Sequence, residues 1–355
     1  MLRFASIALF LVFTIGCAAP DPSTETAEAP ADDVATESSV VNVYSARHYD
    51  TDQTLYDRFE AETGIAVNVI EGDSAALLER LTREGEQSPA DVFITVDAGR
   101  LHQAAEAGIF QPTASDLLNE RVPASLRHPD GLWFGLTKRA RVIVAAKDRV
   151  AADAIASYED LADPAWSGRL LIRSSTNVYN QSLVGSLIAD LGEEAVEEWC
   201  RGVVANFARP PQGGDRDQIR AVAAGEGDLA VVNTYYLAQM IAATDKPADQ
   251  EAAAQVAVIF PNQGGRGTHV NISGAGVVAG AANAEHGVRF LEFLTGEEAQ
   301  NVFAGGNKEY PVVDGIAPVP ELASFGEFEE DDLNASVFGG NNRAALMLMD
   351  RCGWR

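Results

Sequence analysis

The sequence predicts an α/β fold of two lobes joined by a hinge. Short apolar runs rich in β-branched residues alternate with segments whose apolar residues recur at helical spacing. This alternation restarts after about residue 146, behind an extended stretch suited to crossing between lobes. A chain of 355 residues with 46% hydrophobic residues has the length for two domains and enough apolar side chains for their cores. We therefore expect a hinge-bending clamp with about two crossing segments.

The first lobe is expected to begin with a strand at residues 40–44. A helix follows, which Asp50 or Asp52 would cap and Gly64 would end. Further elements are expected as strands at 65–70 and 91–95 and helices at 75–83 and 98–107. Strands that alternate with helices in this way indicate βαβ units around a mostly parallel sheet.

The second lobe follows two extended segments, 131–136 and 140–146, the second of which is a candidate crossing between lobes. Later strands are expected at 170–173, 229–232, 256–260 and 274–279, and helices at 181–188, 193–203, 215–224, 284–294 and 297–303. Taken together, these elements predict an N-lobe of residues 40–139 plus about 266–317. The C-lobe would comprise residues 140–265 plus about 318–355.

The N-terminus carries the pattern of a signal peptide over residues 1–16. Arg3 precedes an apolar stretch whose helix would be only ~18 Å long, too short for a hydrocarbon core of ~30 Å. The segment resembles a bacterial lipoprotein signal, with Cys17 as the lipidated first residue. The usual lipoprotein motif prefers Leu where Thr14 stands, so cleavage without lipid is the alternative. Residues 17–39 form a polar tether with almost nothing to bury.

Charge and cysteine content narrow the function classes. A formal net charge of -26 excludes a nucleic-acid-binding surface made of Lys and Arg. Acidity of this kind usually keeps a protein soluble. Besides Cys17 the chain has Cys200 and Cys352, which in an exported protein predict a disulfide. Two separate buried thiols are the alternative.

Phenols and one imidazole follow the ends of three expected strands. His48 and Tyr49 follow the first strand of the N-lobe, Tyr179 follows the strand at 170–173, and Tyr235 and Tyr236 follow the strand at 229–232. Ligands of open α/β sheets bind outside the carboxyl ends of strands. The sequence therefore predicts one site built from both lobes.

The chemistry of such a set favours a ferric ion. A free tyrosine has a pKa near 10, so a strongly polarising cation is needed to make it a phenolate at neutral pH. Phenolate is a hard anionic oxygen donor, and three or four of them would offset the charge of Fe³⁺. Tyr49, Tyr235 and Tyr236 also lie near expected helix N-termini, which favour the ionised form.

Ordinary structural roles are the alternative for each residue. A lone tyrosine is usually a half-buried core residue, and we assign Tyr44, Tyr56, Tyr158 and Tyr310 that role. His48 could equally cap a turn or bond a carboxylate, and its neighbour Tyr49 is what makes it a candidate ligand. The remaining histidines show no ligand spacing.

Five strings in the chain resemble a known family. They read Val-Tyr-Ser-Ala-Arg-His-Tyr (43–49), Asp-Val-Phe-Ile-Thr-Val-Asp (91–97), Arg-Ser-Ser-Thr-Asn-Val-Tyr-Asn-Gln-Ser-Leu (173–183), Asn-Phe-Ala-Arg-Pro-Pro-Gln-Gly (206–213) and Val-Asn-Thr-Tyr-Tyr-Leu (232–237). From Val41 to the C-terminus the chain is similar to the periplasmic ferric-iron-binding proteins of iron ABC importers, in their FutA-type branch (iron-deficiency-induced protein A). This resemblance implies a transferrin-like clamp of the class II periplasmic-binding-protein fold, which hands iron to a permease with its ATPase.

The resemblance also implies the residues of the site. The family's phenolate ligands fall on Tyr49, Tyr179, Tyr235 and Tyr236, with His48 a ligand in some members. Another branch of the family places a glutamate where this chain has Val96, which argues against that branch. Arg47, Arg139 and Arg209 are candidates for cations behind the phenolates, where they would lower phenol pKa values. Plain surface ion pairs are the alternative for these arginines.

Two other functions compete with iron capture. An enzyme is disfavoured because no catalytic or phosphate-binding motif stands at a strand exit. A binding protein of the same fold for an organic cation, such as a polyamine or thiamine, would use the tyrosines as stacking faces. The expectation is a monomeric, non-enzymatic periplasmic protein, lipid-anchored at the membrane. Its ligand would be Fe³⁺, while His48 or a protonated phenol would admit Fe²⁺.

Overall fold

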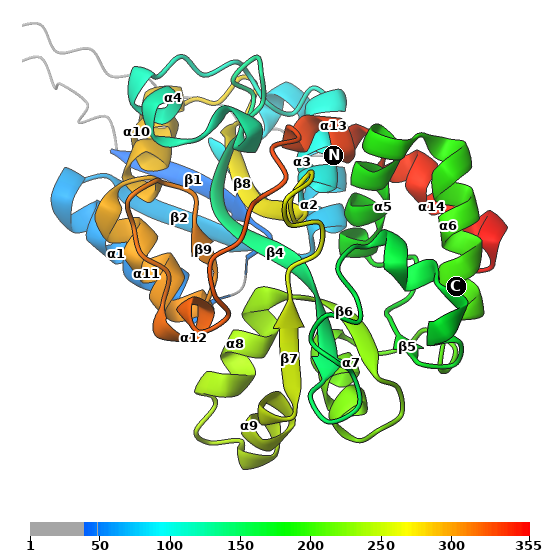
Figure 1. Ribbon diagram of the computed structural model, residues 1–355. Coiled ribbons are helices and arrows are strands. Elements are labelled where there is room, and N and C mark those ends of the chain that lie inside the picture. Colours follow the sequence, from blue (N-terminus) through cyan, green and yellow to red (C-terminus); the bar gives the residue numbers. More distant parts are fainter. Residues whose placement is uncertain (1–38, 48) are drawn as a thin grey trace, which may run out of the picture. The chain divides into compact units, whose positions relative to one another are not determined.

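The computed structural model describes residues 39–47 and 49–355, drawn as a ribbon in Figure 1. The predicted signal peptide, the lipidation site Cys17, the tether up to residue 38 and the candidate ligand His48 lie outside the described residues. The span Ser39–Arg355 packs as one compact unit. The boundaries predicted for two lobes within it stay a prediction. In the described part of the chain, no helix is both long and apolar enough to cross a bilayer.

The strands of the described residues join in one nine-stranded sheet. They are β1 (Val40–Ser45), β2 (Ala66–Glu71), β3 (Val92–Val96), β4 (Phe134–Ala146), β5 (Leu170–Leu171), β6 (Leu229–Asn233), β7 (Val256–Ile259), β8 (Val270–Val277) and β9 (Tyr310–Pro311). Their order is β2-β1-β3-β8-β4-β6-β5, and β7 and β9 also pair with β4. The strand β4 therefore connects the two sets of strands.

The long strand β4 is the crossing segment that the sequence predicts. Its residues 134–140 pair with β8, and its residues 141–145 pair with β6. The prediction of two separate extended segments, 131–136 and 140–146, is wrong, because the strand continues through the polar residues between them. Thr137 and Arg139 are buried there and have polar partners, so they do not interrupt the strand.

The sheet is mixed, and the expectation of a mostly parallel sheet is wrong. The pairs β1–β2, β1–β3 and β5–β6 are parallel, as βαβ units require. All pairings of β4 with β6, β7, β8 and β9 are antiparallel, and so is β3 with β8. The crossing strands β4 and β8 run antiparallel to each other. β8 is also antiparallel to β3, and β4 is antiparallel to β6, so antiparallel pairs join the two sets of parallel strands.

Fourteen helices cover the sheet in the part of the chain that the structure describes (Figure 1). They are α1 (Asp50–Thr63), α2 (Ser74–Glu84), α3 (Ala98–Glu106), α4 (Asp116–Arg121), α5 (Val178–Leu191), α6 (Glu193–Ala205), α7 (Asp215–Ala223), α8 (Thr234–Ala242), α9 (Pro247–Ala254), α10 (Ala284–Leu294), α11 (Glu297–Asn307), α12 (Pro320–Ala323), α13 (Ala335–Gly340) and α14 (Asn342–Cys352). The helices α4, α9, α12, α13 and α14 are not among those predicted. The α5 helix starts at Val178, earlier than the predicted start at 181, so Tyr179 lies in its first turn.

Aromatic side chains pack helices and the C-terminal segment against one another. Phe59 of α1 meets Phe290 of α10 edge-on at 5.0 Å between ring centroids. Beyond β6, Trp354 at the C-terminal end lies 5.6 Å from Phe207 and 6.4 Å from Trp199. Such pairs add about 0.5–1.5 kcal/mol each to the free energy of burial. The C-terminal helix α14 is thereby held in the core.

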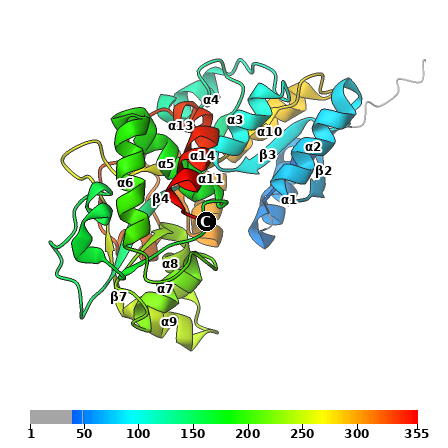
Figure 2. The same cartoon turned by 90° about the vertical axis from the view of Figure 1, so that its right-hand side faces the viewer.

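Glycines allow α3, α5 and α13 to approach one another closely, and Figure 2 shows these helices side by side. A Cβ on Gly185 of α5 would lie 2.6 Å from the carbonyl oxygen of Phe338, and one on Gly339 of α13 would lie 2.8 Å from that of Ala98. Neither separation is possible for real atoms, so both positions require glycine. This junction fixes the direction of α5, the helix that carries Tyr179.

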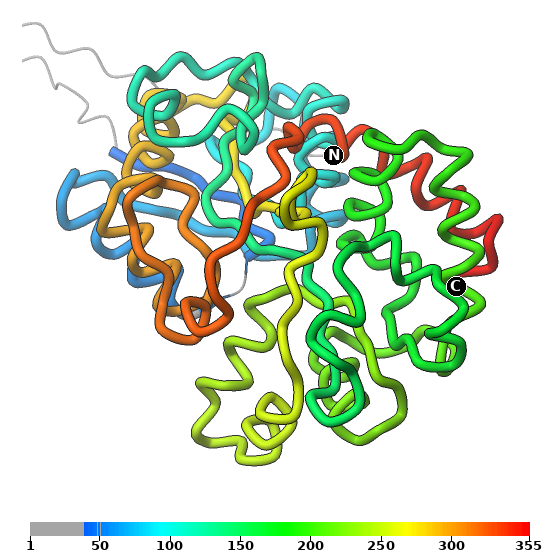
Figure 3. Tube along the Cα trace, in the orientation of Figure 1, coloured from blue at the N-terminus to red at the C-terminus, as the bar shows by residue number. Residues whose placement is uncertain are grey.

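The chain between α12 and α13 lies against the residues directly before β8, the second of the two crossing strands. Figure 3 follows it in orange to red. The amide of Thr268 donates to the carbonyl of Glu329 at 2.8 Å, and the amide of Asp331 donates to the carbonyl of Thr268 at 2.9 Å. Thr268 lies just before β8, so the C-terminal part of the chain pairs with the crossing segment itself.

Candidate metal centre

The four predicted phenols occupy the first turns of helices that follow strands. Tyr49 directly precedes α1, and Tyr179 is the second residue of α5. Tyr235 and Tyr236 are the second and third residues of α8, directly after β6. Tyr235 is buried, and the other three are half-buried. Each phenol therefore lies near the positive end of a helix dipole.

The structure brings these four phenols into one cluster. The hydroxyl of Tyr235 donates to that of Tyr179 at 3.3 Å, which joins α8 to α5. The rings of Tyr235 and Tyr236 lie 4.1 Å apart between centroids. Tyr49 interacts electrostatically with Tyr179, Tyr235 and Tyr236 from the far side of β4. Residues separated by more than one hundred positions thus form a single patch of oxygen donors.

Burial disfavours the ionised form of Tyr49, Tyr179 and Tyr235. It raises the pKa of Tyr49 to about 12, Glu309 adds to the rise, and Arg47 and Arg139 oppose it. Burial raises the pKa of Tyr179 and of Tyr235 as well, and the neighbouring phenols raise both further. Ionising several phenols together therefore requires an opposite charge between them.

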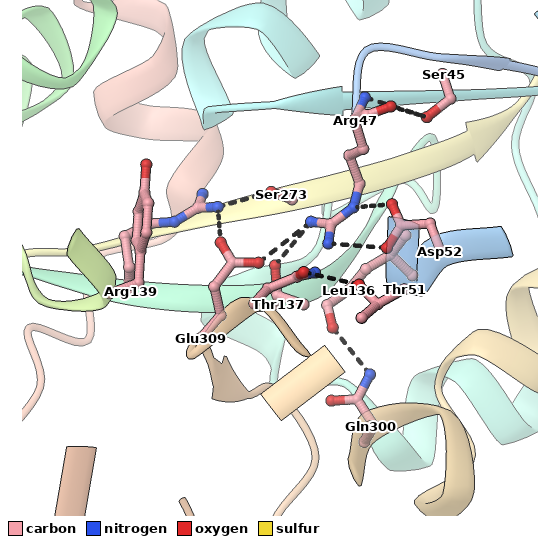
Figure 4. Close-up of polar contacts among 12 residues, drawn as sticks. Ser45, Arg47, Thr51, Asp52, Leu136, Thr137, Arg139, Ser273, Gln300 and Glu309 are labelled. Carbon is pink, nitrogen blue, oxygen red and sulfur yellow. Dashed lines mark hydrogen bonds and ion pairs between the residues drawn. The ribbon is translucent and has the colours of Figure 1, made fainter. Parts of the chain in front are cut away.

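A buried ion network joins Arg47 and Arg139 to Asp52 and Glu309 (Figure 4). Arg47 donates through Nε to Asp52 Oδ2 at 2.9 Å and through Nη1 to Glu309 Oε2 at 3.3 Å. Arg139 forms an ion pair with the other oxygen of Glu309 and donates to Ser273 Oγ at 2.7 Å. We call Arg47, Asp52, Arg139 and Glu309 the Glu309 group. The four side chains are almost fully buried.

The predicted arginines Arg47 and Arg139 face the phenols. The guanidinium carbon of Arg47 lies 5.0 Å from the ring centroid of Tyr49, and that of Arg139 lies 5.7 Å from the ring centroid of Tyr235. Both distances lie within the ~6 Å range of cation–π attraction. Arg209 is placed elsewhere, where it pairs with Glu226 and approaches Gln218 at 3.5 Å.

A second ion group lies behind Tyr179. Arg141 and Arg173 both donate to the buried carboxylate of Asp215, at 3.2 and 3.1 Å. Their guanidinium carbons lie 6.0 and 5.7 Å from the ring centroid of Tyr179. We call Arg141, Arg173 and Asp215 the Asp215 group. Outside both groups, Arg216 lies 4.9 Å from the ring centroid of Tyr236.

Sequence reasoning missed Arg141, Arg173 and the acidic members of both groups. Arg141 directly precedes the apolar β-branched run 142–144, and a charge next to such a run signals a buried partner. Glu309 and Asp215 carry no comparable signal, because each lies in an ordinary polar context next to a helix or turn. Their roles follow from contacts with residues far away in the chain.

The donor set fits a hard cation. Phenol oxygens are hard donors once ionised, and they suit small, highly charged ions better than soft metals. Among the described residues, no group of three or more His, Cys, Asp or Glu side chains is placed to hold a metal.

The two cysteines predicted to form a disulfide are free thiols in the structure. Cys200 is buried in α6, and Cys352 ends α14, where its Sγ donates to the carbonyl of Glu197 at 3.5 Å. Burial and a hydrogen bond with the Cys352 thiol raise the pKa of Cys200. The thiols are thus neighbours without being bonded, and the disulfide stays a prediction.

Comparisons with known proteins agree with this fold. A family model described as "Bacterial extracellular solute-binding protein" matches residues 87–328. Iron uptake protein A1 of Synechocystis is 49% identical over 352 residues, covering 99% of this chain and 98% of that protein. The solved structure of Trichodesmium IdiA (FutA), in complex with iron and citrate ligands, matches with a TM-score of 0.87 and 54% identity. That match covers 89% of this chain and all of the other.

A shorter match bears on the alternative ligand. The thiamine-binding periplasmic protein of Brucella abortus is 35% identical over only 72 residues, or 20% of this chain. The full-length matches confirm the predicted two-lobed solute-binding fold. The chain belongs to the bacterial extracellular solute-binding proteins, in the group that includes iron uptake protein A1.

Proposed function

We propose that this chain captures Fe³⁺ in a cleft between its lobes and delivers it to an ABC permease and its ATPase. Tyr49, Tyr179, Tyr235 and Tyr236 would be the ligands. The observation that carries the proposal is the clustering of these four phenols, which come from three separate strand–helix junctions. The relatives named as iron uptake and iron-bound proteins support the same ligand.

Capture and ionisation would occur together. Without iron, burial keeps Tyr49, Tyr179 and Tyr235 neutral, so these three phenols do not repel one another as anions. Fe³⁺ supplies the charge that drives off the phenol protons, and the helix N-termini and the arginines behind the rings stabilise the anions. Release of protons is therefore part of binding, and acidification favours release of iron.

The clamp would close on the ion as it binds. We assign Tyr49 to the N-lobe of residues 40–139 plus about 266–317, and the other three ligands to the C-lobe of residues 140–265 plus about 318–355. A ligand held by both lobes stabilises the closed form by its differential affinity for that form. His48 would complete the coordination in this arrangement, and its imidazole or one protonated phenol would admit Fe²⁺.

Export and anchoring fit this role. We assign residues 1–16 to a signal peptide and Cys17 to lipid attachment, so that the tether of residues 17–39 holds a monomeric binding protein in the periplasm next to its permease. Membership in an extracellular solute-binding family supports the location. A role in binding rather than catalysis is supported by the relatives, which are named as binding and uptake proteins.

An organic cation is disfavoured by the surroundings of the rings. A polyamine or thiamine would need free aromatic faces for stacking. Arginines already lie over the rings of Tyr49, Tyr179, Tyr235 and Tyr236. These fixed cations would repel a cationic ligand but stabilise phenolates.

Colour tests the proposal. Phenolate–iron coordination absorbs visible light, so the purified protein should become coloured on titration with ferric citrate. The double substitution Tyr235→Phe and Tyr236→Phe should abolish the colour and lower the apparent affinity by at least about a hundredfold, since half of the ligands are lost.

The matched control is Tyr310→Phe, which removes a buried hydroxyl that has no hydrogen-bond partner. It should leave the titration unchanged. A wild-type protein that stays colourless while its circular dichroism spectrum shows an intact fold would refute iron capture by phenolates.

A further inference from the structure

The two ion groups behind the phenols differ in formal charge. In the Glu309 group, two arginines face two carboxylates, so its formal charge is zero. In the Asp215 group, two arginines share one carboxylate, which leaves one surplus positive charge. The Asp215 group is therefore the one that can balance a negative charge at the iron site.

The surplus charge is held where water screens it little. The side chain of Asp215 is 0% exposed, that of Arg141 is 1% exposed and that of Arg173 is 21% exposed. A charge in such surroundings acts at an effective dielectric constant of about 20 instead of about 80. Its effect on a nearby ion is correspondingly larger than that of a surface charge.

Asp215 is connected to both tyrosine-bearing helices. Its Oδ2 accepts a hydrogen bond from the amide of Asn233 at 2.7 Å, directly before α8. Through Arg141 it reaches Asn180, the neighbour of Tyr179 in α5. The charge of Arg173 also interacts with Tyr179 and Tyr236. Changes in the charge of the Asp215 group are therefore felt at Tyr179 and Tyr236.

The charge of the site depends on the oxidation state of the ion. Four phenolates around Fe³⁺ leave one negative charge, which the surplus charge of the Asp215 group balances. Four phenolates around Fe²⁺ leave two negative charges, of which the surplus charge of the Asp215 group balances one. Arg216 is a further cation near Tyr236, and it is unchanged in all the variants compared below.

We propose that Asp215 sets the preference of this site for Fe³⁺ over Fe²⁺, because it neutralises one of the two arginines that face Tyr179. This inference rests on the proposed iron site. Loss of the Asp215 charge leaves two surplus cations and favours the reduced ion. Loss of the Arg173 charge leaves the Asp215 group without a surplus cation and favours the oxidised ion.

Spectroelectrochemistry with opposite charge changes tests the inference. Protein loaded from ferric citrate is titrated with dithionite in the presence of mediators, and the visible phenolate–iron band reports the ferric fraction. Asp215→Asn keeps the acceptor for the Asn233 amide and should lower the ratio of ferric to ferrous affinity about tenfold. Tenfold corresponds to about +59 mV in the midpoint potential of a one-electron couple. Arg173→Gln should raise the ratio by a similar factor.

Asp228→Asn is the matched control. Asp228 also joins two arginines, Arg149 and Arg169, but it lies at the other end of β6. Its substitution makes the same change in charge and should leave the ratio unchanged. Thermal unfolding of the iron-free proteins shows which variants are folded.

The outcomes separate the inference from the function on which it rests. Shifts of opposite sign in the two variants, with none in the control, support it. Shifts of the same sign, or shifts no larger than in the control, overturn it while leaving iron binding intact. If Asp215→Asn does not fold, a potential unchanged in Arg173→Gln overturns it. A wild type that takes up no iron refutes the proposed function itself and the inference with it.

Discussion

Glu309 and Asp215 show how single carboxylates organise this molecule. Each is fully buried, and each holds two arginines that lie over tyrosine rings. A buried charge is tolerated only when it is paired, so the ion groups fix the positions of the arginines and, through them, the surroundings of the phenols. At the residue scale, the electrostatics of the site depends on acids that are not ligands.

Removal of the Glu309 charge should destabilise the iron-free protein. In Glu309→Gln, Arg139 loses its carboxylate partner while it stays buried, since Asp52 pairs only with Arg47. We expect the free energy of unfolding to fall by about 3–5 kcal/mol, measured by urea denaturation.

Glu330→Gln serves as the control for that measurement. Glu330 pairs with Lys138 at 2.8 Å in a half-exposed position, where an ion pair contributes about 1 kcal/mol or less. Equal losses in both variants would contradict a special role of Glu309.

His269 predicts a dependence of stability on pH. Burial and the nearby charges of Arg141 and Arg266 lower its pKa in the folded state to about 3, against an ordinary value of 6.5. The unfolded chain therefore binds the proton first as pH falls below 6.5, and folding loses about 2 kcal/mol between pH 7 and pH 5 from this group alone. In His269→Gln the same pH change should cost about 2 kcal/mol less.

Urea denaturation at both pH values checks the His269 prediction. His286→Gln controls for removal of an imidazole elsewhere, since the ring of His286 meets the carbonyl of Val40 at 2.8 Å. A pH dependence that is identical in wild type and His269→Gln would show that another group is responsible.

At the scale of elements, the site depends on where helices begin and how closely they pack. Tyr179 and Tyr235 meet because α5 and α8 both start at the same edge of the sheet. The position of α5 is set from behind by α3 and α13, at contacts that only glycine permits. Packing far from the ligands thus determines their separation.

A methyl group at this junction should loosen it. In Gly185→Ala the new Cβ would meet the carbonyl oxygen of Phe338 at 2.6 Å, so α5 or α13 must move. We expect a loss of about 1–3 kcal/mol in the free energy of unfolding, measured by urea denaturation.

Gly305→Ala is the matched control, because Gly305 also lies in a helix and a Cβ there meets no atom within 4 Å. It should be neutral or stabilising by up to about 1 kcal/mol. Should Gly185→Ala be as stable as this control, the junction is not tightly packed.

At the scale of the whole molecule, β4 and the C-terminal segments connect parts of the chain that are far apart. β4 pairs with strands on both sides of the crossing. The helix α14 packs on α5 and α6, with Trp354 buried beneath them. The last twenty residues therefore complete a core that begins near residue 143.

The neighbouring thiols predict a disulfide between α6 and α14. In an oxidising compartment Cys200 and Cys352 should form a disulfide, and intact mass should show the loss of two hydrogens relative to the reduced protein. Closing so long a loop stabilises the fold by about 4–5 kcal/mol in the chain-entropy model.

Cys352→Ser, which cannot form the bond, is the reference for that gain in unfolding experiments with and without reductant. If both thiols of the exported wild type react with iodoacetamide without prior reduction, the disulfide does not form.

Much of the fold and the candidate ligand set can be predicted from the sequence alone. Strand and helix periodicity is a local property, so most elements and the tyrosines at three strand exits are predictable from short stretches of chain. The cluster itself is predictable because strands of one sheet end at common edges.

Other features were decided only by the tertiary structure. The continuity of β4 through Thr137 and Arg139 depends on buried partners that lie far away in the chain. Arg209 belongs to a string shared with the family, yet it pairs with Glu226 and not with a tyrosine. No local sequence pattern identifies Glu309 and Asp215, because a carboxylate joins a buried ion group only through the arginines that the fold brings to it. The sequence by itself determined which oxygens could hold an ion, and the tertiary structure decided which charges surround them, since charge balance depends on contacts between distant residues.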